Sequence, residues 1–264
     1  MQDIQLYNGN CLEIMKEIPD KKIDMILCDL PYGTTACKWD IPLDLEKMWS
    51  CYERIISDNG AIVLFGVQPF TSLLVASNFK LFKYSLVWKK SKAQGFAQAP
   101  YRFMSEHEDI LIFSKAGTAK NAKIRMNFFP QNLIYKPVVR KGKKANSSEH
   151  RIAKTDQKDF ISEYTNYPKS ILNFKSVGKT LHATQKPVEL LEYLIKTYSK
   201  ENDLILDNCM GSGSTGVAAK NLNRRFIGIE LEKKYFEIAE KRINGEIAYK
   251  KIEEPEQNYK LPGF

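Results

Sequence analysis

Short apolar runs alternate along the first 113 residues with stretches in which apolar side chains recur every three or four positions. The runs predict strands and the stretches predict helices, so this part of the chain has the succession of a mostly parallel sheet covered by helices. The predicted strands are 4–7, 23–28, 61–65, 82–88 and 110–113, and the predicted helices are 11–18, 43–56 and 69–77.

The same alternation returns in the last third of the chain, with strands at 204–206 and 226–229 and helices at 187–198, 213–222 and 233–243. Only 34 residues follow Glu230, too few to supply the missing strands of a full sheet. The early strands must therefore pair beside the late ones, which predicts an α/β fold with a circularly permuted, mostly parallel sheet.

Between these two parts the periodicity fades, and Gly, Asn, Ser and Lys predominate among scattered aromatic residues. A structureless loop of this length is rare inside a compact domain, so an inserted subdomain is predicted. The chain then divides into 1–114, a basic insertion at 115–180, a second half of the main domain at 181–252, and a tail at 253–264.

The charge is concentrated in that insertion. The 264 residues include 40 Lys and Arg against 31 Asp and Glu, a net charge of +9. Residues 115–180 hold 15 of the basic side chains and 4 of the acidic ones, so the rest of the chain is slightly acidic. Such a distribution favours a module that faces a polyanion; a merely solvated lysine-rich surface is the alternative.

Composition excludes several other classes of protein. At 43% hydrophobic residues the chain can form a core, which excludes wholesale disorder. No apolar run approaches the ~18 residues of a membrane-spanning helix, and the N-terminus lacks a signal pattern, so no membrane association and a cytoplasmic location are expected. The five cysteines form no C-x-x-C pair and do not cluster with the three histidines, so neither a disulfide framework nor a metal site is predicted.

A glycine-rich turn follows the predicted strand at 204–206. Gly211, Gly213 and Gly216 have the G-x-G-x-x-G spacing, and Glu230 ends the next strand. This is the arrangement in which glycines admit a nucleotide and an acid binds ribose hydroxyls; an ordinary turn with a helix cap is the alternative. Asp207 before the turn suits the amine of S-adenosylmethionine, whereas a dinucleotide would bring phosphate there.

The sequence Asp29-Leu30-Pro31-Tyr32 follows another predicted strand, where ligand-binding loops of open sheets lie. The Asp29 side chain and the Leu30 carbonyl can accept the two hydrogens of an exocyclic amino group, and Tyr32 offers a face on which a base can stack. Paired acceptors favour the pyramidal geometry that makes a planar amine nucleophilic, and they stabilise the positive charge that develops.

Asp29-Leu30-Pro31-Tyr32 resembles the D-P-P-Y motif of amino-group DNA methyltransferases, with Leu at the second position. LHATQKPVEL at 181–190 is similar to the H-x-T-Q-K-P element of these enzymes, and LDNCMGSGSTG is similar to their cofactor loop. NGNCLEIM resembles their G-D-x-L-E element, with Asn10 in place of an acid, and YSLVWKK and EHEDILIFSK resemble the segments that flank their target-base pocket.

The resemblance implies roles for individual residues. The catalytic positions are Asp29, Leu30, Pro31 and Tyr32. The positions that bind S-adenosylmethionine are Asn10, Cys11, Asp29, Thr184, Gln185, Lys186, Asp207, Cys209, Gly211, Gly213, Ser214, Thr215 and Glu230.

The order of the blocks is similar to that of the β-group of these enzymes, with a target-recognition segment between the catalytic and cofactor halves. This resemblance implies a Rossmann-like methyltransferase that acts on N6 of a flipped adenine in double-stranded DNA. Methylation of cytosine N4, an inactive DNA-binding homologue and a nicotinamide-dependent dehydrogenase are the alternatives. The resemblance also admits a second copy of the chain and a cognate restriction endonuclease as partners, in the cytoplasm of a bacterium or a phage-infected cell.

Overall fold

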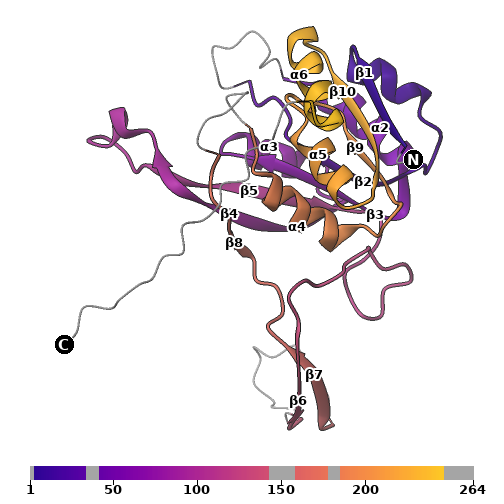
Figure 1. Ribbon diagram of the computed structural model, residues 1–264. Coiled ribbons are helices and arrows are strands. Elements are labelled where there is room, and N and C mark those ends of the chain that lie inside the picture. The colour runs from indigo at the N-terminus through magenta and orange to yellow at the C-terminus, as the bar shows by residue number, and fades with distance from the viewer. Residues whose placement is uncertain (1–2, 34–41, 143–157, 178–184, 247–264) are drawn as a thin grey trace.

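The computed structural model describes residues 3–33, 42–142, 158–177 and 185–246. Its centre is an eight-stranded sheet in the order β1-β10-β9-β2-β3-β5-β4-β8 (Figure 1). The strands are β1 (Ile4–Asn8), β2 (Ile23–Cys28), β3 (Ile56–Gly66), β4 (Phe82–Gln94), β5 (Ser105–Phe113), β8 (Ile171–Asn173), β9 (Leu204–Asp207) and β10 (Arg225–Glu230).

The pairing confirms the predicted order of early and late strands. β1 pairs in parallel with β10, and β2 pairs in parallel with β9, so strands from both ends of the chain lie side by side. β3 and β5 are antiparallel, as are β4 and β5, while the remaining pairs of this eight-stranded sheet are parallel. The result is the circularly permuted, mostly parallel sheet that the sequence predicts.

Helices cover both faces of the sheet, and alternation along the strands explains the two layers. In β2, Met25 and Leu27 pack into the cluster formed with α4, α5 and α6, whereas Ile26 and Cys28 pack with α1, α2 and α3. Both faces are thus apolar, as expected for a buried parallel strand. The helices are α1 (Cys11–Ile14), α2 (Leu45–Ile55), α3 (Phe70–Ser77), α4 (Val188–Tyr198), α5 (Ser214–Asn221) and α6 (Lys233–Asn244).

One predicted helix, 11–18, is shorter than expected. Its α-helical part ends at Ile14, and Met15–Glu17 continue as a single 3-10 turn before Ile18 adopts an extended backbone. No helix among the described residues is long and apolar enough to cross a membrane.

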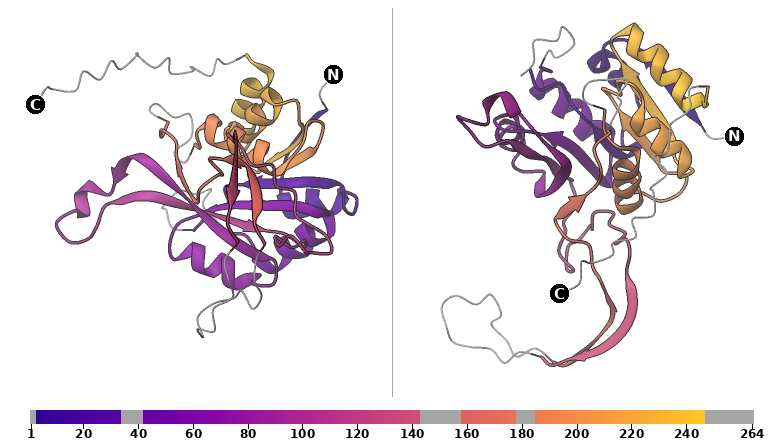
Figure 2. Two further views of the ribbon diagram at one scale, coloured as in Figure 1. Left: turned by 90° about the horizontal axis from the view of Figure 1, so that it is seen from below. Right: turned by 60° about the vertical axis from the view of Figure 1, so that its left-hand side comes forward.

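The described part of the basic segment contains three strands that the fading periodicity does not reveal. β6 (Ile134–Arg140) and β7 (Phe160–Thr165) form a separate antiparallel pair that projects from the body (Figures 1 and 2). β8, in contrast, joins the edge of the main sheet beside β4. The insertion is therefore tied into the main sheet at one strand while β6 and β7 extend outward.

The topology gathers several strand ends at one edge of the sheet. β1, β2, β3, β9 and β10 are parallel, so their carboxyl ends meet there. Because β5 runs against β3 and β4 runs against β5, the beginning of β5 and the end of β4 lie at the same edge. Ligand sites of open α/β sheets form at such an edge.

Candidate active site

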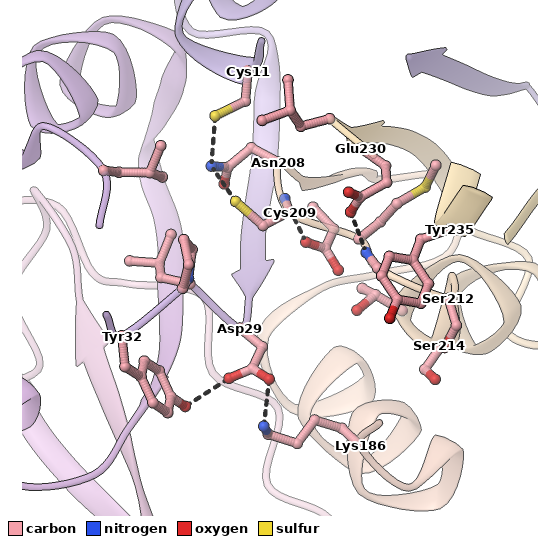
Figure 3. Close-up of a pocket in the computed structure, with 18 of the residues that line it drawn as sticks. Cys11, Asp29, Tyr32, Lys186, Asn208, Cys209, Ser212, Ser214, Glu230 and Tyr235 are labelled. Atoms are coloured by element: carbon pink, nitrogen blue, oxygen red, sulfur yellow. Dashed lines mark hydrogen bonds and ion pairs between the residues drawn. The ribbon is translucent and has the colours of Figure 1, made fainter. Parts of the chain in front are cut away.

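A cavity of about 370 Å³ opens at this edge, within the size range of small-molecule sites. Residues after β1, β2, β9 and β10 line it, together with the residues that precede α4 (Figure 3). Segments that lie far apart in the sequence therefore meet around one space, as the predicted motifs require.

Asp29 lies on the wall of the cavity, directly after β2. Its Oδ1 accepts a hydrogen bond from the Tyr32 hydroxyl at 2.6 Å, and its Oδ2 lies 2.5 Å from the Lys186 ammonium. The Tyr32 ring in turn lies against Phe70 of α3, with ring centroids 5.0 Å apart. Asp29 is thus fixed from two sides, and both oxygens retain lone pairs for a ligand.

Asp207 ends β9 on another wall of the same cavity. Its Oδ1 accepts the backbone N–H of Cys209 at 3.1 Å, and the Thr215 hydroxyl also bonds the carboxyl group. Burial outweighs these bonds and raises the pKa of Asp207 to about 7. A cation that enters the cavity would therefore stabilise the ionised form of the Asp207 carboxyl group.

Glu230 ends β10 and binds the glycine-rich turn. Its Oε2 accepts the Gly211 N–H at 2.9 Å, and its Oε1 accepts the Glu232 N–H at 2.8 Å. These bonds point the carboxylate into the cavity, where its remaining lone pairs can accept hydroxyl groups. Burial nevertheless raises the pKa of Glu230.

The glycine-rich turn is also supported from behind by α6. The buried Arg242 guanidinium donates to the Ser212 carbonyl, to Ser212 Oγ at 2.8 Å and to Ser214 Oγ at 3.4 Å. Gly213 precedes α5 with a φ of +79°, and a Cβ there would lie 2.8 Å from the Ala239 Cβ. Gly213 therefore serves the packing of the turn on α6, and it does not line the cavity.

Polar and thiol groups form the opposite side of the cavity. The Asn10 Oδ1 caps α1 by accepting the Leu12 N–H at 2.9 Å, so a ligand would meet its other lone pair or its amide hydrogens. The Asn208 amide donates towards Cys11 Sγ at 3.7 Å and Cys209 Sγ at 3.5 Å, while its oxygen accepts the Tyr52 hydroxyl at 2.5 Å.

The structure brings most of the predicted residues to this one cavity, whereas Thr184 lies outside the described residues. Those that line it are Asn10, Cys11, Asp29, Leu30, Pro31, Tyr32, Gln185, Lys186, Asp207, Cys209, Gly211, Ser214, Thr215 and Glu230.

The motifs overlooked Asn208, Ser212, Tyr235 and Arg242, of which the first three line the cavity and Arg242 supports it. Asn208 and Ser212 lie inside the glycine-rich segment, so their position was a usable signal. The signal for Arg242 was a charged residue beside Ile243 on the apolar face of α6.

These groups fit the predicted S-adenosylmethionine. Asp207 offers a carboxyl group to an amine, Glu230 offers acceptors to ribose hydroxyls, and Gly211 lets the backbone approach closely. Leu30, Leu191 and Leu231 add apolar surface to the same walls. The Asp207 carboxyl group on the same wall would face the phosphates of a dinucleotide, which disfavours that class of cofactor there.

Comparisons with known proteins agree on one family. The family model of N6/N4 methyltransferases, described as DNA methylase, matches residues 23–241. The chain is 56% identical to the Type II methyltransferase M2.LlaDCHI of Lactococcus lactis subsp. cremoris, over 92% of this chain and 90% of the relative. It is 26% identical to the Type II methyltransferase M.BglII of Bacillus subtilis, over 98% of this chain and 72% of the relative.

Solved structures agree with these relatives. The crystal structure of an M1.HpyAVI–SAM complex superposes with a TM-score of 0.60 at 27% identity, covering 91% of this chain and 99% of the other. A cytosine-N4-specific PvuII DNA methyltransferase superposes with a TM-score of 0.62 at 13% identity, covering 93% of this chain and 94% of the other. The second likeness concerns the fold alone, which is the Rossmann-like fold predicted above.

Proposed function

The chain belongs to the N6/N4 family of DNA methylases, and from this premise we propose that it methylates the exocyclic N6 amino group of a flipped adenine at a specific DNA sequence. Its methyl donor is S-adenosylmethionine. The observation that carries the proposal is the position of Asp29, which joins the cofactor cavity to the Tyr32 and Phe70 rings.

The residues around the cavity divide into two groups. Asp207, Glu230, Gly211 and the residues beside them hold the cofactor, and Gln185 and Lys186 line the same space. When bound, the cofactor supplies an electrophilic methyl group on a sulfonium. The target base has to leave the duplex to reach it, at a cost of a few kcal/mol.

Asp29 and the Leu30 carbonyl accept the two hydrogens of the target amine. An amine conjugated to a ring is a poor nucleophile because its lone pair is delocalised, and two acceptors draw it towards a tetrahedral geometry with the lone pair directed at the methyl group. The same acceptors stabilise the positive charge on nitrogen as the new bond forms. Tyr32, fixed by Asp29 and Phe70, orients the base by stacking.

Adenine is preferred to cytosine because Asp stands at the first position of the motif, where the resemblance associates Ser with cytosine enzymes. The chemistry at the amine is the same for both bases. N4-methylation of cytosine is accordingly the competing assignment within the family.

The basic insertion supplies the contact with double-stranded DNA. Lys136, Arg140 and Lys141 are exposed on or beside β6, and Lys158 lies near the start of β7. Cations on a projecting pair of strands suit the phosphate backbone. Because the relatives are bacterial proteins, we expect the target DNA in the cytoplasm, and a second copy of the chain and a cognate restriction endonuclease remain predicted partners.

The methylated base can be identified directly. Genomic DNA free of base methylation is incubated with the protein and S-adenosylmethionine that carries a deuterated methyl group, then digested and analysed by mass spectrometry. We expect labelled N6-methyladenine. Labelled N4-methylcytosine would transfer the assignment to cytosine, and DNA binding without label in either base would support an inactive DNA-binding protein.

A further inference from the structure

A row of four charged side chains with alternating sign leads away from Asp29. The Lys186 Nζ lies 2.5 Å from Asp29 Oδ2 and 3.2 Å from Glu108 Oε2, and the Lys90 Nζ lies 2.5 Å from Glu108 Oε1. The exposed fractions of the Asp29, Lys186, Glu108 and Lys90 side chains are 20%, 6%, 11% and 7%. The row thus begins at the cavity wall, where Figure 3 shows Lys186 pointing at Asp29, and continues into the sheet.

The fold brings these four groups together from four separate segments. Asp29 follows β2, Lys186 precedes α4, Glu108 lies near the beginning of β5, and Lys90 lies in the second half of β4. In the antiparallel register Trp88 stands opposite Glu108, which places Lys90 and Glu108 at the same edge as Asp29.

The two lysines are nearly enclosed by protein. The Lys186 ammonium lies 5.0 Å from the centre of the Phe65 ring, and the Lys90 ammonium lies 5.6 Å from that of Trp88. Glu108 Oε2 is buried and makes no hydrogen bond of good geometry, so its contact with Lys186 is ionic. Interactions between charges are strong in such an environment because little water screens them.

Asp29 and Lys186 would already neutralise one another without a second pair. Burying two more charges costs several kcal/mol each before their mutual attraction repays it. Glu108 and Lys90 are not among the described residues that line the cofactor cavity. Their arrangement therefore has to be explained by what they do to Lys186 and Asp29.

We propose that Glu108 and Lys90 are positioning residues for methyl transfer: Glu108 holds the Lys186 ammonium beside Asp29, and Lys90 offsets the negative charge of Glu108, so that Asp29 stays an ionised acceptor for the target amine. This inference rests on the proposed function. It means that β4 and β5 support the Asp29–Lys186 pair at the cavity wall. Neither residue touches the reacting atoms; both act through Lys186.

Several groups face the Asp29 carboxyl group, and their effects can be separated by sign. Burial raises the pKa of Asp29, Lys186 opposes that rise, and the negative charge of Glu108 adds to it. Tyr32 donates a hydrogen bond that lowers the pKa of Asp29, and Asp207 and Cys28 lie close enough to interact with its charge. For Glu108, Lys186 and Lys90 overcome the opposite effect of burial and hold its pKa below the usual value.

Removing the charge of Lys90 and removing the charge of Glu108 should move the Asp29 pKa in opposite directions. Lys90→Met leaves the negative charge of Glu108 without its outer partner, so the Asp29 pKa rises. Glu108→Gln removes that negative charge, so the Asp29 pKa falls. The double variant Lys90→Met/Glu108→Gln restores a neutral row and should return near the wild-type value.

The test is the pH dependence of kcat at saturating DNA and S-adenosylmethionine. Activity requires the Asp29 carboxylate, so it is lost as the pH falls through the Asp29 pKa. We expect this acid limb to move up by about one pH unit in Lys90→Met and down by a similar amount in Glu108→Gln. In the double variant it should lie within a few tenths of a unit of wild type, with the Kd for S-adenosylmethionine unchanged within about twofold.

An exposed pair from the same two strands supplies the control. Lys89 and Glu106 lie 3.9 Å apart with 53% and 54% of their side chains exposed. Lys89→Met and Glu106→Gln should leave the acid limb in place, because water screens exposed charges.

Titration of the Asp29 carboxyl carbon by NMR, assigned with Asp29→Asn, gives a readout that does not need turnover. Shifts of the same sign in both single variants, or a double variant that does not return towards wild type, would overturn the inference. If the wild-type protein methylates no DNA, the proposed function fails, while the NMR titration still decides the inference. A single variant that does not fold leaves the other single variant and the neutral double variant to decide.

Discussion

Burial raises the pKa of two carboxyl groups at neighbouring strand ends, Asp207 and Asp29, whose partners differ. Asp207 is buried, and the bonds from Cys209 and Thr215 do not offset the loss of water, so its pKa rises to about 7. Asp29 is buried as well, but the Lys186 ammonium lies against it. At neutral pH, therefore, Asp207 is still partly protonated, and a bound cation would complete its ionisation.

We therefore expect the affinity for S-adenosylmethionine to increase with pH. If the amine binds the Asp207 carboxylate, the ionised fraction of a group with a pKa of about 7 grows about tenfold between pH 6 and pH 8, and the association constant should follow it. Isothermal titration calorimetry of wild type and Asp207→Asn measures this, because the variant reports the titration of the ligand alone. Equal pH profiles for the two proteins would contradict the role given to Asp207.

At the scale of elements, the glycine-rich turn depends on its support by α6. Gly213 has a left-handed backbone, and the space beside it is filled by the Cα and Cβ of Ala239. Gly245, which follows α6, has a similar φ of +86°, and no atom lies within 4 Å of the place that a Cβ would occupy there. The two glycines share a backbone requirement and differ in packing.

Gly213→Ala should destabilise the protein more than Gly245→Ala. Both substitutions force an alanine into the left-handed region at about 1 kcal/mol. Gly213→Ala adds an overpacking cost of about 1–3 kcal/mol and displaces the turn that carries Gly211. Urea unfolding and calorimetry with S-adenosylmethionine should show reduced stability and affinity for Gly213→Ala. Equal effects of the two variants would show that α6 does not constrain the turn.

How well an element can be predicted depends on where its side chains lie. β2 and β9 are apolar on both faces because helices cover both, so a continuous run of apolar residues marks them. The outer parts of β4 and β5 and all of β6 expose polar and apolar residues alike, and no periodicity marks them.

The same limit applies to the site. Asp29, Asp207 and Glu230 were predictable because each directly follows or ends an apolar strand. Glu108 and Lys90 required the antiparallel register of β4 and β5, which the sequence pattern does not specify.

At the scale of the whole molecule, charge and chemistry occupy different regions. The cavity lies at one edge of the main sheet, whereas β6 and β7 extend from the body with exposed Lys136 and Arg140 (Figure 2). Ile134, Tyr135, Val139, Phe160 and Ile161 are exposed on the same pair of strands. This arm, formed by β6 and β7, carries both cations and apolar side chains. Such a surface suits DNA, because the cations can contact phosphates while the apolar side chains contact sugars or bases.

Removing charge from this arm should flatten the salt dependence of DNA binding. The logarithm of the binding constant falls with the logarithm of salt concentration by about 0.9 per phosphate contacted. The triple variant Lys136→Gln/Arg140→Gln/Lys141→Gln should reduce the slope by about two to three. Lys234→Gln/Lys241→Gln on α6 is the control, with no expected change. Fluorescence anisotropy at several salt concentrations measures both slopes, and equal slopes would contradict the assignment of the insertion.

We propose that methyl transfer to an amino group of DNA takes place at Asp29. Its replacement by alanine removes an acceptor for the amine while Lys186 keeps Glu108 as an ionic partner, so the cavity should remain able to bind S-adenosylmethionine. Asp58→Ala, which removes an exposed carboxylate paired with Lys21 at 2.9 Å, is the matched control.

The most direct measurement is therefore the rate of methyl incorporation into DNA by wild type, Asp29→Ala and Asp58→Ala at saturating S-adenosylmethionine, with cofactor binding checked by calorimetry. We expect a loss of at least about 100-fold for Asp29→Ala and no change for Asp58→Ala. Methylation by Asp29→Ala within about tenfold of wild type would contradict it, because the acceptor role then belongs to another residue.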